Sequence, residues 1–557
     1  VAGALGGIAG ALSVNLQGYV SPNALHWTQS GTLMIMVILG GVATVWGGAV
    51  GAAALLLART RIELLAGLAV AAAGEALLAV ALIPGHDLKL FVSPATHLTA
   101  LLLGAAVVGA MAWALARWPQ AVPVVLLAAA PFRISTSVGT QKAYLLDPLY
   151  VVLAASLLAL AIRALRGQAT RALPRFVAIP AAAFVLFAGI SLVWTWDLRQ
   201  GSIELLFFLF PFSALVVAVV QSPFERWHPR ALAVVLVALA ALFSSAALFQ
   251  RVTRGHLLAS DVERSNAYTS FFRVTSLFKD PSVFGRNVVI AIGVLLVAVW
   301  LGRIRFWLGA ALIAFLWAGL YFAYSQSSYA ALFAVAVAVA YTLGGGTLRR
   351  VVVVAAAVCV LGGAAFVAAT AVNDSARKAT SGRTRLVRVT WIVFEHHPLA
   401  GVGIGGQPRA SKKEAKTELS AKRDRSHTTP LTVAAELGIV GFLIYGALMA
   451  AATRVLYLLT RRDRALGLGA AAVFLALFVH SLFYAGFFED PIVWGVIAVA
   501  AWALGVMAAD RAGTLAPSGC VDGSSSASPS LGSSSPVPPS PPTSKPESVP
   551  RGKSTRS

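Results

Sequence analysis

Residues 351–372 read VVVVAAAVCVLGGAAFVAATAV, a run of 22 residues without a charged side chain. A helix of about 20 apolar residues is long enough to cross the hydrocarbon core of a bilayer. Similar runs recur along most of the chain and are separated by short polar gaps. Because lipid offers no partner to an unpaired backbone group, these runs predict membrane-spanning α-helices.

The composition supports this interpretation over the whole chain. Of its 557 residues 58% are apolar and only 12% are charged, whereas about a quarter of an average soluble protein is charged. The apolar segments are 1–13, 31–58, 64–84, 97–116, 119–132, 144–162, 176–196, 203–221, 230–249, 287–302, 306–324, 329–343, 351–372, 431–453, 467–487 and 492–509. The first and fifth are short for a full span, so we predict an all-α polytopic membrane protein with about 14–16 transmembrane helices.

Basic residues in the short loops predict the orientation. They are Arg59, Arg61, Arg117, Arg163, Arg166, Arg171, Arg175, Arg226, Arg230, Arg303, Arg305, Arg349, Arg350, Arg454, Arg461, Arg462 and Arg464. Such loops are typically cytoplasmic. The alternation of spans then places the two longest loops, 250–286 and 373–430, on the outer face. This distribution also argues against nucleic acid as the partner of a chain with a net charge of +22.

The sequence predicts neither a metal site nor a cofactor. The two cysteines are far apart in sequence, Cys359 in an apolar run and Cys520 in the tail, which argues against a disulfide framework. We find no cluster with the ligand spacing of zinc or calcium. The adjacent His396 and His397 should point in different directions on a helix and make a poor metal pair.

The outer loop 373–430 carries the strongest functional signal. Its 58 residues are polar in a chain that otherwise allows only short gaps, and long loops are usually functional. Between positions 371 and 430, twelve basic side chains face five acidic ones, an excess of seven positive charges. A cationic loop above a membrane bundle suits an anionic, lipid-linked substrate.

Within this loop, residues 381–397 predict an amphipathic helix on the outer surface. Its apolar stripe consists of Val387, Trp391 and Phe394. Its arginines are Arg383, Arg385 and Arg388. Arginine binds phosphate well because its planar fork donates two parallel hydrogen bonds. The alternative is an interfacial helix that only touches lipid headgroups.

Two features follow the helix. Residues 398–406, PLAGVGIGG, resemble a phosphate-binding glycine loop, but no strand precedes them and no Gly-Lys-Ser/Thr follows. A turn that seats the outer helix against the bundle is the better interpretation.

His427, just before a span, either removes a proton from a hydroxyl group or is an interfacial side chain without a role. Glu436, inside that span, is a functional candidate or bonds a neighbouring helix.

The other outer loop adds positive charge to the same face through Arg273, Lys279 and Arg286. Asp280-Pro281 predicts a turn or a helix start. The polar residues 324–328, YSQSS, favour helix capping over hydrogen bonds to a sugar.

Taken in order, these pieces resemble the O-antigen ligase / O-antigen polymerase superfamily over residues 120–505. The resemblance rests on RVTSLFKDP (273–281), GRTRLVRVTWIVFEHHPLAGVGIGG (382–406), SHTTPLTVAAELGIVGFLIYGAL (426–448) and HSLFYAGFFEDPIVW (480–494). Two positions differ from the family, which usually has Asn where this chain has Thr428 and often Asn where it has Ser282.

This resemblance implies a metal-independent glycosyltransferase without a cofactor, with its active site at the outer face of the cytoplasmic membrane. The donor would be a polyprenyl-pyrophosphate-linked glycan and the acceptor a sugar hydroxyl of a glycan or glycolipid. Arg273 and Arg383 would hold the pyrophosphate, and His427 would act as base on the acceptor hydroxyl. Further substrate-binding candidates are Arg385, Arg388, Lys279, Arg286 and Glu436.

The first 60 residues show a second resemblance. VAGALGGIAGALSVNLQGYVSP and MIMVILGGVATVWGGAVGAA resemble the C-terminal part of a branched-chain amino acid ABC-transporter permease. We therefore expect three parts: a truncated or fused permease-like segment (1–60), a ligase-like membrane domain (61–509) and a disordered Ser/Pro-rich cytoplasmic tail (510–557). A transporter, either such a permease or an anion carrier, is the alternative function.

Overall fold

The fold was analysed in a computed structural model that describes residues 43–82, 96–138, 141–168, 171–255, 262, 266, 271–372, 383–414 and 426–515. The chain divides into two units, residues 1–510 and 511–557, and the description below concerns the first. Most of the predicted permease-like segment and nearly all of the predicted tail lie outside the described residues.

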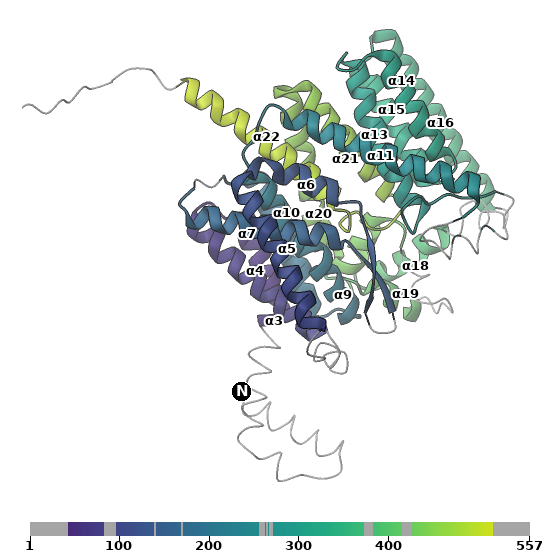
Figure 1. The fold of residues 1–557 in the computed structure, drawn as a ribbon. Coiled ribbons are helices and arrows are strands. Elements are labelled where there is room, and N and C mark those ends of the chain that lie inside the picture. The colour runs from purple at the N-terminus through teal and green to yellow at the C-terminus, as the bar shows by residue number, and fades with distance from the viewer. Residues whose placement is uncertain are drawn as a thin grey trace, which may run out of the picture. The chain divides into compact units, whose positions relative to one another are not determined.

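Figure 1 shows a bundle of α-helices with one small hairpin. In the first half the elements are α3 (Ala43–Leu57), α4 (Arg61–Leu82), α5 (Thr96–Arg117), η4 (Pro119–Ala121), α6 (Val122–Ala129), β1 (Ile134–Val138), β2 (Gln141–Leu145), α7 (Asp147–Leu165), α8 (Arg175–Ile190), η5 (Ser191–Val193), α9 (Leu198–Glu204), the π-helical η6 (Leu205–Leu209), α10 (Phe210–Val220) and α11 (His228–Thr253). In the second half they are α13 (Pro281–Trp300), α14 (Phe306–Tyr321), α15 (Gln326–Leu343), α16 (Gly346–Val372), α18 (Arg383–His396), α19 (Gln407–Glu414), α20 (Thr429–Arg462), α21 (Arg464–Ser481) and α22 (Pro491–Leu515).

The predicted class, an all-α polytopic membrane protein, is confirmed. Among the described residues nine helices are long and apolar enough to cross a bilayer. A tenth is possible if the pair 102–117 and 119–129, bent by 106°, forms one broken span. The predicted number of about 14–16 is higher because it includes segments outside the described residues and short apolar helices such as α14.

The hairpin of β1 and β2 was not predicted. The two strands pair antiparallel, with Ile134 opposite Leu145 and Val138 opposite Gln141. The sequence ISTSV has the alternation of a strand, but it lies between long apolar runs that dominated the interpretation.

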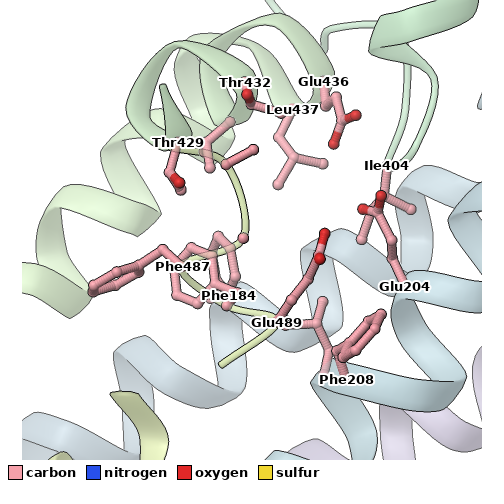
Figure 2. A pocket seen from close by; sticks show the side chains of 15 residues that line it. Phe184, Glu204, Phe208, Ile404, Thr429, Thr432, Glu436, Leu437, Phe487 and Glu489 are labelled. Atoms are coloured by element: carbon pink, nitrogen blue, oxygen red, sulfur yellow. The ribbon is translucent and has the colours of Figure 1, made fainter. Parts of the chain in front are cut away.

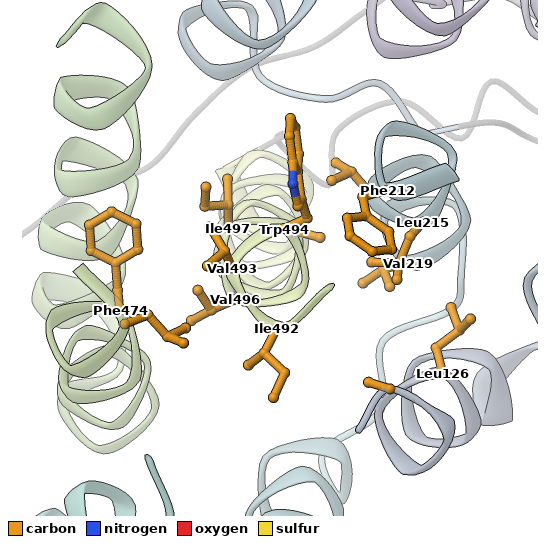
Figure 3. Packing of buried hydrophobic residues seen from close by; sticks show 14 of the residues in the cluster. Leu126, Phe212, Leu215, Val219, Phe474, Ile492, Val493, Trp494, Val496 and Ile497 are labelled. Atoms are coloured by element: carbon orange, nitrogen blue, oxygen red, sulfur yellow. The ribbon is translucent and has the colours of Figure 1, made fainter. Parts of the chain in front are cut away.

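The apolar core contains α22 between α10 and α21 (Figure 3). Val493 and Trp494 on α22 are almost completely buried, as is Phe212 on α10. The indole of Trp502 donates a hydrogen bond of 2.7 Å to the carbonyl oxygen of Ser222, which satisfies a polar group within apolar surroundings. Helix α22 is therefore largely buried among the helices around it, with 67% of residues 491–508 buried.

Local capping explains where α13 and α15 begin. The Asp280 carboxylate accepts a hydrogen bond of 2.6 Å from the Ser282 N–H, and Pro281 follows at the first helical position. Ser325 caps α15 by accepting from the N–H of Ser328. The sequence predicted a turn or a helix start at Asp280-Pro281 and helix capping within residues 324–328, and the structure has a helix start at the first and a cap at the second.

Helix α3, the described part of the permease-like segment, packs on α4 and α8. The contact with α4 is close because both helices present glycine. A Cβ atom on Gly51 would lie 2.2 Å from the backbone nitrogen of Ala71, and one on Gly74 would lie 2.0 Å from that of Gly48. Helix α3 therefore packs on α4 so closely that the two backbones leave no room for a side chain at Gly51 or Gly74.

Candidate functional site

Helix α20 is interrupted at Gly438, where φ is +65°. In an unbroken helix the N–H of Ile439 would bond the carbonyl oxygen of Ala435. Here it donates instead to the carbonyl oxygen of Pro398, at 2.8 Å, and Ala435 accepts from the N–H of Val402, at 3.1 Å. The glycine-rich turn 398–406 thus takes the place of the missing helical hydrogen bonds.

Glycine is required where this turn meets α20. Gly401 has φ of +68°, and a Cβ atom there would lie 2.3 Å from the carbonyl carbon of Glu436. The N–H of the nearby Gly403 donates to the carbonyl oxygen of Glu436 at 2.8 Å. The turn therefore seats the segment that follows α18 against the bundle, as predicted.

The same turn is held on its other side by the segment after α8. Thr195 donates its hydroxyl proton to the carbonyl oxygen of Ile404 at 2.8 Å, and the indole of Trp194 donates to that of Ala400 at 3.2 Å. The Ser191 hydroxyl accepts from the N–H of Ile404 at 3.0 Å. The turn is consequently a rigid support for the residues on either side of it.

A polar cluster forms around Tyr484, between α21 and α22. Its ring lies 6.1 Å from that of His427 and 5.3 Å from that of His480, measured between centroids. Its hydroxyl bonds the carboxylate of Asp280, and burial, followed by the negative charge of Asp280, raises the pKa of Tyr484. The phenol is therefore neutral and can donate a proton in a hydrogen bond.

Arg286 extends this cluster on α13. Its Nη2 lies 2.6 Å from Oδ2 of Asp490, and both side chains are buried. The Nε of Arg286 is buried and has no hydrogen-bond partner in the described part of the chain. Arg286, a predicted substrate-binding residue, thus holds Asp490 of the pair Asp490-Pro491 through Nη2. Its Nε–H is available as a further hydrogen-bond donor.

Arg273 is fixed by backbone groups. Its Nε and Nη2 donate to the carbonyl oxygens of Ala323 and Tyr324, at 3.3 and 3.4 Å. Burial lowers the pKa of Arg273, and the nearby Asp280 counteracts part of that effect. The arginine and the cluster around Tyr484 therefore share one carboxylate neighbour, Asp280.

The polar turn 324–328 belongs to the same region. The Ser327 hydroxyl lies 3.1 Å from Nε2 of His480, and the Ser325 hydroxyl lies 2.9 Å from that of Ser328. The segment of Arg273, this turn, the start of α20 and the end of α21 consequently meet in one place.

Helix α18 departs from the expected arrangement of faces. Its buried side consists of Leu386, Val389, Thr390 and Val393. Val387 and Trp391, in the predicted apolar stripe, are exposed by 44% and 48%. The helix packs on α19 and α20 through the neighbouring face. An exposed apolar stripe on a seated helix is compatible with a bilayer surface beside it.

The other predicted cations differ in how far they are exposed. Arg385 is half-buried, and Arg388 and Lys279 are exposed. Arg383 is the first residue of α18, and its side chain lies outside the described part. The structure brings Arg273, Arg286 and His427 to the region of Asp280 and Tyr484, while α18 packs on α19 and α20.

Glu414 joins the end of α18 to α19. One carboxylate oxygen lies 2.7 Å from Nε2 of His397 and the other 3.2 Å from Nδ1 of His396. Across the described ranges no three His, Cys, Asp or Glu residues are grouped as a metal site requires. His396 and His397, expected to point in different directions, thus both contact one carboxylate, that of Glu414 on α19.

Figure 2 shows a cavity whose wall includes Thr429 and residues 485–489, which follow His427 and Tyr484 closely in sequence. Glu204, Glu436 and Glu489 direct their carboxylates toward it, and Thr429, Thr432, Ile404 and several phenylalanines complete its wall. Oε1 of Glu436 accepts from the N–H of Gln407 at 3.3 Å, so this predicted site residue contacts both the cavity and α19.

Sequence reasoning missed several residues of this region, namely Glu204, His480, Tyr484, Glu489 and Asp490. The quoted stretch 480–494 contained four of them, but their roles depend on contacts with residues about 200 positions away. Its two acidic residues in FFEDP, between apolar spans, were the available signal.

The described region is thus a buried polar site at helix ends within a multi-pass membrane protein. Residues 311–446 match the family model described as O-Antigen ligase, which confirms the resemblance over that stretch. The match supports a membrane enzyme of the glycosyl-transfer type, similar to O-antigen ligases and polymerases. It includes Arg383, His427 and Glu436 but not Arg273 or Glu489. No curated protein matches the chain.

Proposed function

We propose that the protein transfers a glycan from a polyprenyl-pyrophosphate carrier to a sugar hydroxyl at the outer face of the cytoplasmic membrane. The observation that carries this proposal is the meeting of Arg273, Arg286 and His427 around Asp280 and Tyr484. Cations and an imidazole at the ends of apolar spans suit a substrate with an apolar anchor and a charged linkage.

The arginines provide the electrostatic part of the reaction. Arg273 is oriented by two carbonyl oxygens, and the Nε of Arg286 can donate to an added oxygen. With Arg383 at the start of α18, they would neutralise the pyrophosphate as negative charge accumulates on the leaving group. Exposed Arg385, Arg388 and Lys279 would attract the anionic donor over a longer range.

The chemical step is a substitution at the anomeric carbon. The acceptor oxygen forms the new C–O bond, the bond from the anomeric carbon to the pyrophosphate oxygen breaks, and that oxygen keeps the electron pair. His427 takes the proton of the acceptor hydroxyl, and the polyprenyl pyrophosphate leaves. These residues provide base and charge stabilisation without a metal ion, which is the mechanism that we propose.

An assay of glycan lengthening or attachment in membrane vesicles tests the proposal. Vesicles that contain the full chain, radiolabelled lipid-linked glycan and host glycolipids should form a product of higher mass. We expect His427→Ala to reduce its formation by about 100-fold or more. Arg303→Ala, in an exposed loop between α13 and α14, should retain wild-type activity.

Two results would contradict the proposal. One is wild-type product formation by His427→Ala at equal protein level. The other is uptake of branched-chain amino acids by the vesicles without any glycan product, which would favour the transporter suggested by residues 1–60.

A further inference from the structure

The cavity of Figure 2 is built at two irregularities of membrane-spanning helices. Glu204 is the last residue of α9 and precedes the π-helical residues 205–209, and Glu436 lies two residues before the break at Gly438. Helical irregularities of this kind are frequent at functional sites because they redirect side chains. Here they direct two carboxylates into one space, where Glu489 adds a third.

Carboxylates in this place are costly. Glu204 and Glu436 belong to candidate membrane spans, 198–220 and 429–462, and most of the other lining side chains are apolar. Two of the carboxylates accept a hydrogen bond from the protein, Glu204 from Nε2 of Gln200 at 3.1 Å and Glu436 from the N–H of Gln407 at 3.3 Å. Ionisable groups inside spans usually have a function.

An independent observation points to a ligand. Thr429 lines the cavity and is only 6% exposed, and its hydroxyl has no hydrogen-bond partner in the part of the chain that the structure describes. A buried hydroxyl without a partner loses its hydrogen bonds to water without replacement. A polar ligand in the cavity would restore them.

The chemistry of the wall selects among ligands. Carboxylate oxygens accept hydrogen bonds, and within the described residues the three glutamates are not grouped as a metal site requires. A saccharide offers many hydroxyl donors to carboxylates, whereas its C–H faces pack on aromatic rings. Phe184, Phe208 and Phe487 supply such rings at the same wall.

We infer that this cavity binds the acceptor saccharide, with Glu204, Glu436 and Glu489 accepting hydrogen bonds from its hydroxyl groups and Thr429 contributing another. That this saccharide is the acceptor rests on the proposed function. The position agrees with that role, because Thr429 follows His427 by two residues and the lining segment 485–489 directly follows Tyr484. Basic and acidic sides of one site would thus separate donor pyrophosphate from acceptor sugar.

Binding measurements on the full chain in nanodiscs test the inference. The two probes are undecaprenyl pyrophosphate and the glycan that mild acid releases from host envelopes. We expect Glu489→Gln and Thr429→Val each to weaken glycan binding about tenfold, as loss of a hydrogen bond from a ligand does, and to leave binding of undecaprenyl pyrophosphate unchanged. Matched controls are Glu225→Gln and Thr453→Val, which replace exposed side chains elsewhere.

Thr429→Val distinguishes a ligand site from a structural one, because removal of a buried hydroxyl without a partner should not reduce the melting temperature. Unchanged glycan affinity in both cavity variants would overturn the inference, as would saturable Mg²⁺ or Ca²⁺ binding that these variants abolish in place of glycan binding. If the wild type binds glycan in a Glu489-dependent manner but releases no carrier, the proposed function fails and the saccharide site remains.

Discussion

Arg286 and Asp490 form a buried ion pair that joins α13 to the start of α22, with 2.6 Å between Nη2 and Oδ2. Asp490 belongs to the pair Asp490-Pro491, and Arg286 lies five residues after Pro281 of the pair Asp280-Pro281. The ion pair therefore links the two loops whose motifs were quoted for the family resemblance, and it holds the arginine whose Nε is available to a ligand.

Removal of one partner should destabilise the protein. Asp490→Asn leaves Arg286 buried without its counterion, which typically costs about 3–5 kcal/mol. The double variant Arg286→Met/Asp490→Leu should recover part of that loss because no buried charge remains. Thermal unfolding in detergent measures both, and equal melting temperatures of wild type and Asp490→Asn would exclude a structural role of the pair.

Gly401 should not tolerate a side chain. In Gly401→Ala the Cβ atom meets the backbone of Glu436 in a left-handed conformation, so the turn must move away from α20. We expect a loss of more than about 1 kcal/mol in stability and a larger loss of activity. Gly446→Ala, in a helical position with open space around it, should be neutral or stabilising, and comparable behaviour of the two variants would contradict the assigned contact.

Helix α3 should be part of the folded unit. Gly51→Leu would force α3 away from Ala71 on α4, whereas Gly104→Leu on α5 meets open space. We expect Gly51→Leu to lower the yield of folded protein and its melting temperature, with Gly104→Leu close to wild type. Size-exclusion profiles in detergent report this directly. If both variants fold equally well, the permease-like segment contributes little to the bundle.

Tyr484 should position the catalytic region through its hydroxyl group. Tyr484→Phe removes the hydrogen bond to Asp280 but keeps the ring beside His427. Glycan transfer per folded molecule should fall by about tenfold, together with a modest drop in melting temperature, since one hydrogen bond to a charged group is lost. An effect on stability alone, with turnover per folded molecule unchanged, would show that the hydroxyl only supports the fold.

The sequence was sufficient for features that depend on neighbouring residues. Apolar runs predicted the helical class, Asp280-Pro281 predicted a turn or a helix start, and residues 324–328 predicted helix capping, because capping is local. The break at Gly438 was not predicted, since its stability comes from the turn about 35 positions earlier. Likewise, Glu204 becomes part of a site only because α9, α20 and the segment after Tyr484 line one cavity in the folded chain.

The face of α18 illustrates the same limit. Val387 and Trp391 form a correct helical stripe, but packing on α20 uses the adjacent row of Leu386, Val389 and Val393. Periodicity identifies an amphipathic helix and does not decide which apolar row meets protein and which remains available to lipid.

The central claim is that the cluster of Arg273 and His427 cleaves a carrier-linked glycan, and a single-turnover assay tests it most directly. Purified protein in nanodiscs is mixed with radiolabelled lipid-linked glycan and acceptor, and released polyprenyl pyrophosphate is measured over time. The account predicts rapid release by the wild type and a reduction of about 100-fold or more in Arg273→Ala and in His427→Ala, with both variants folded. Release at the wild-type rate by both variants would contradict it.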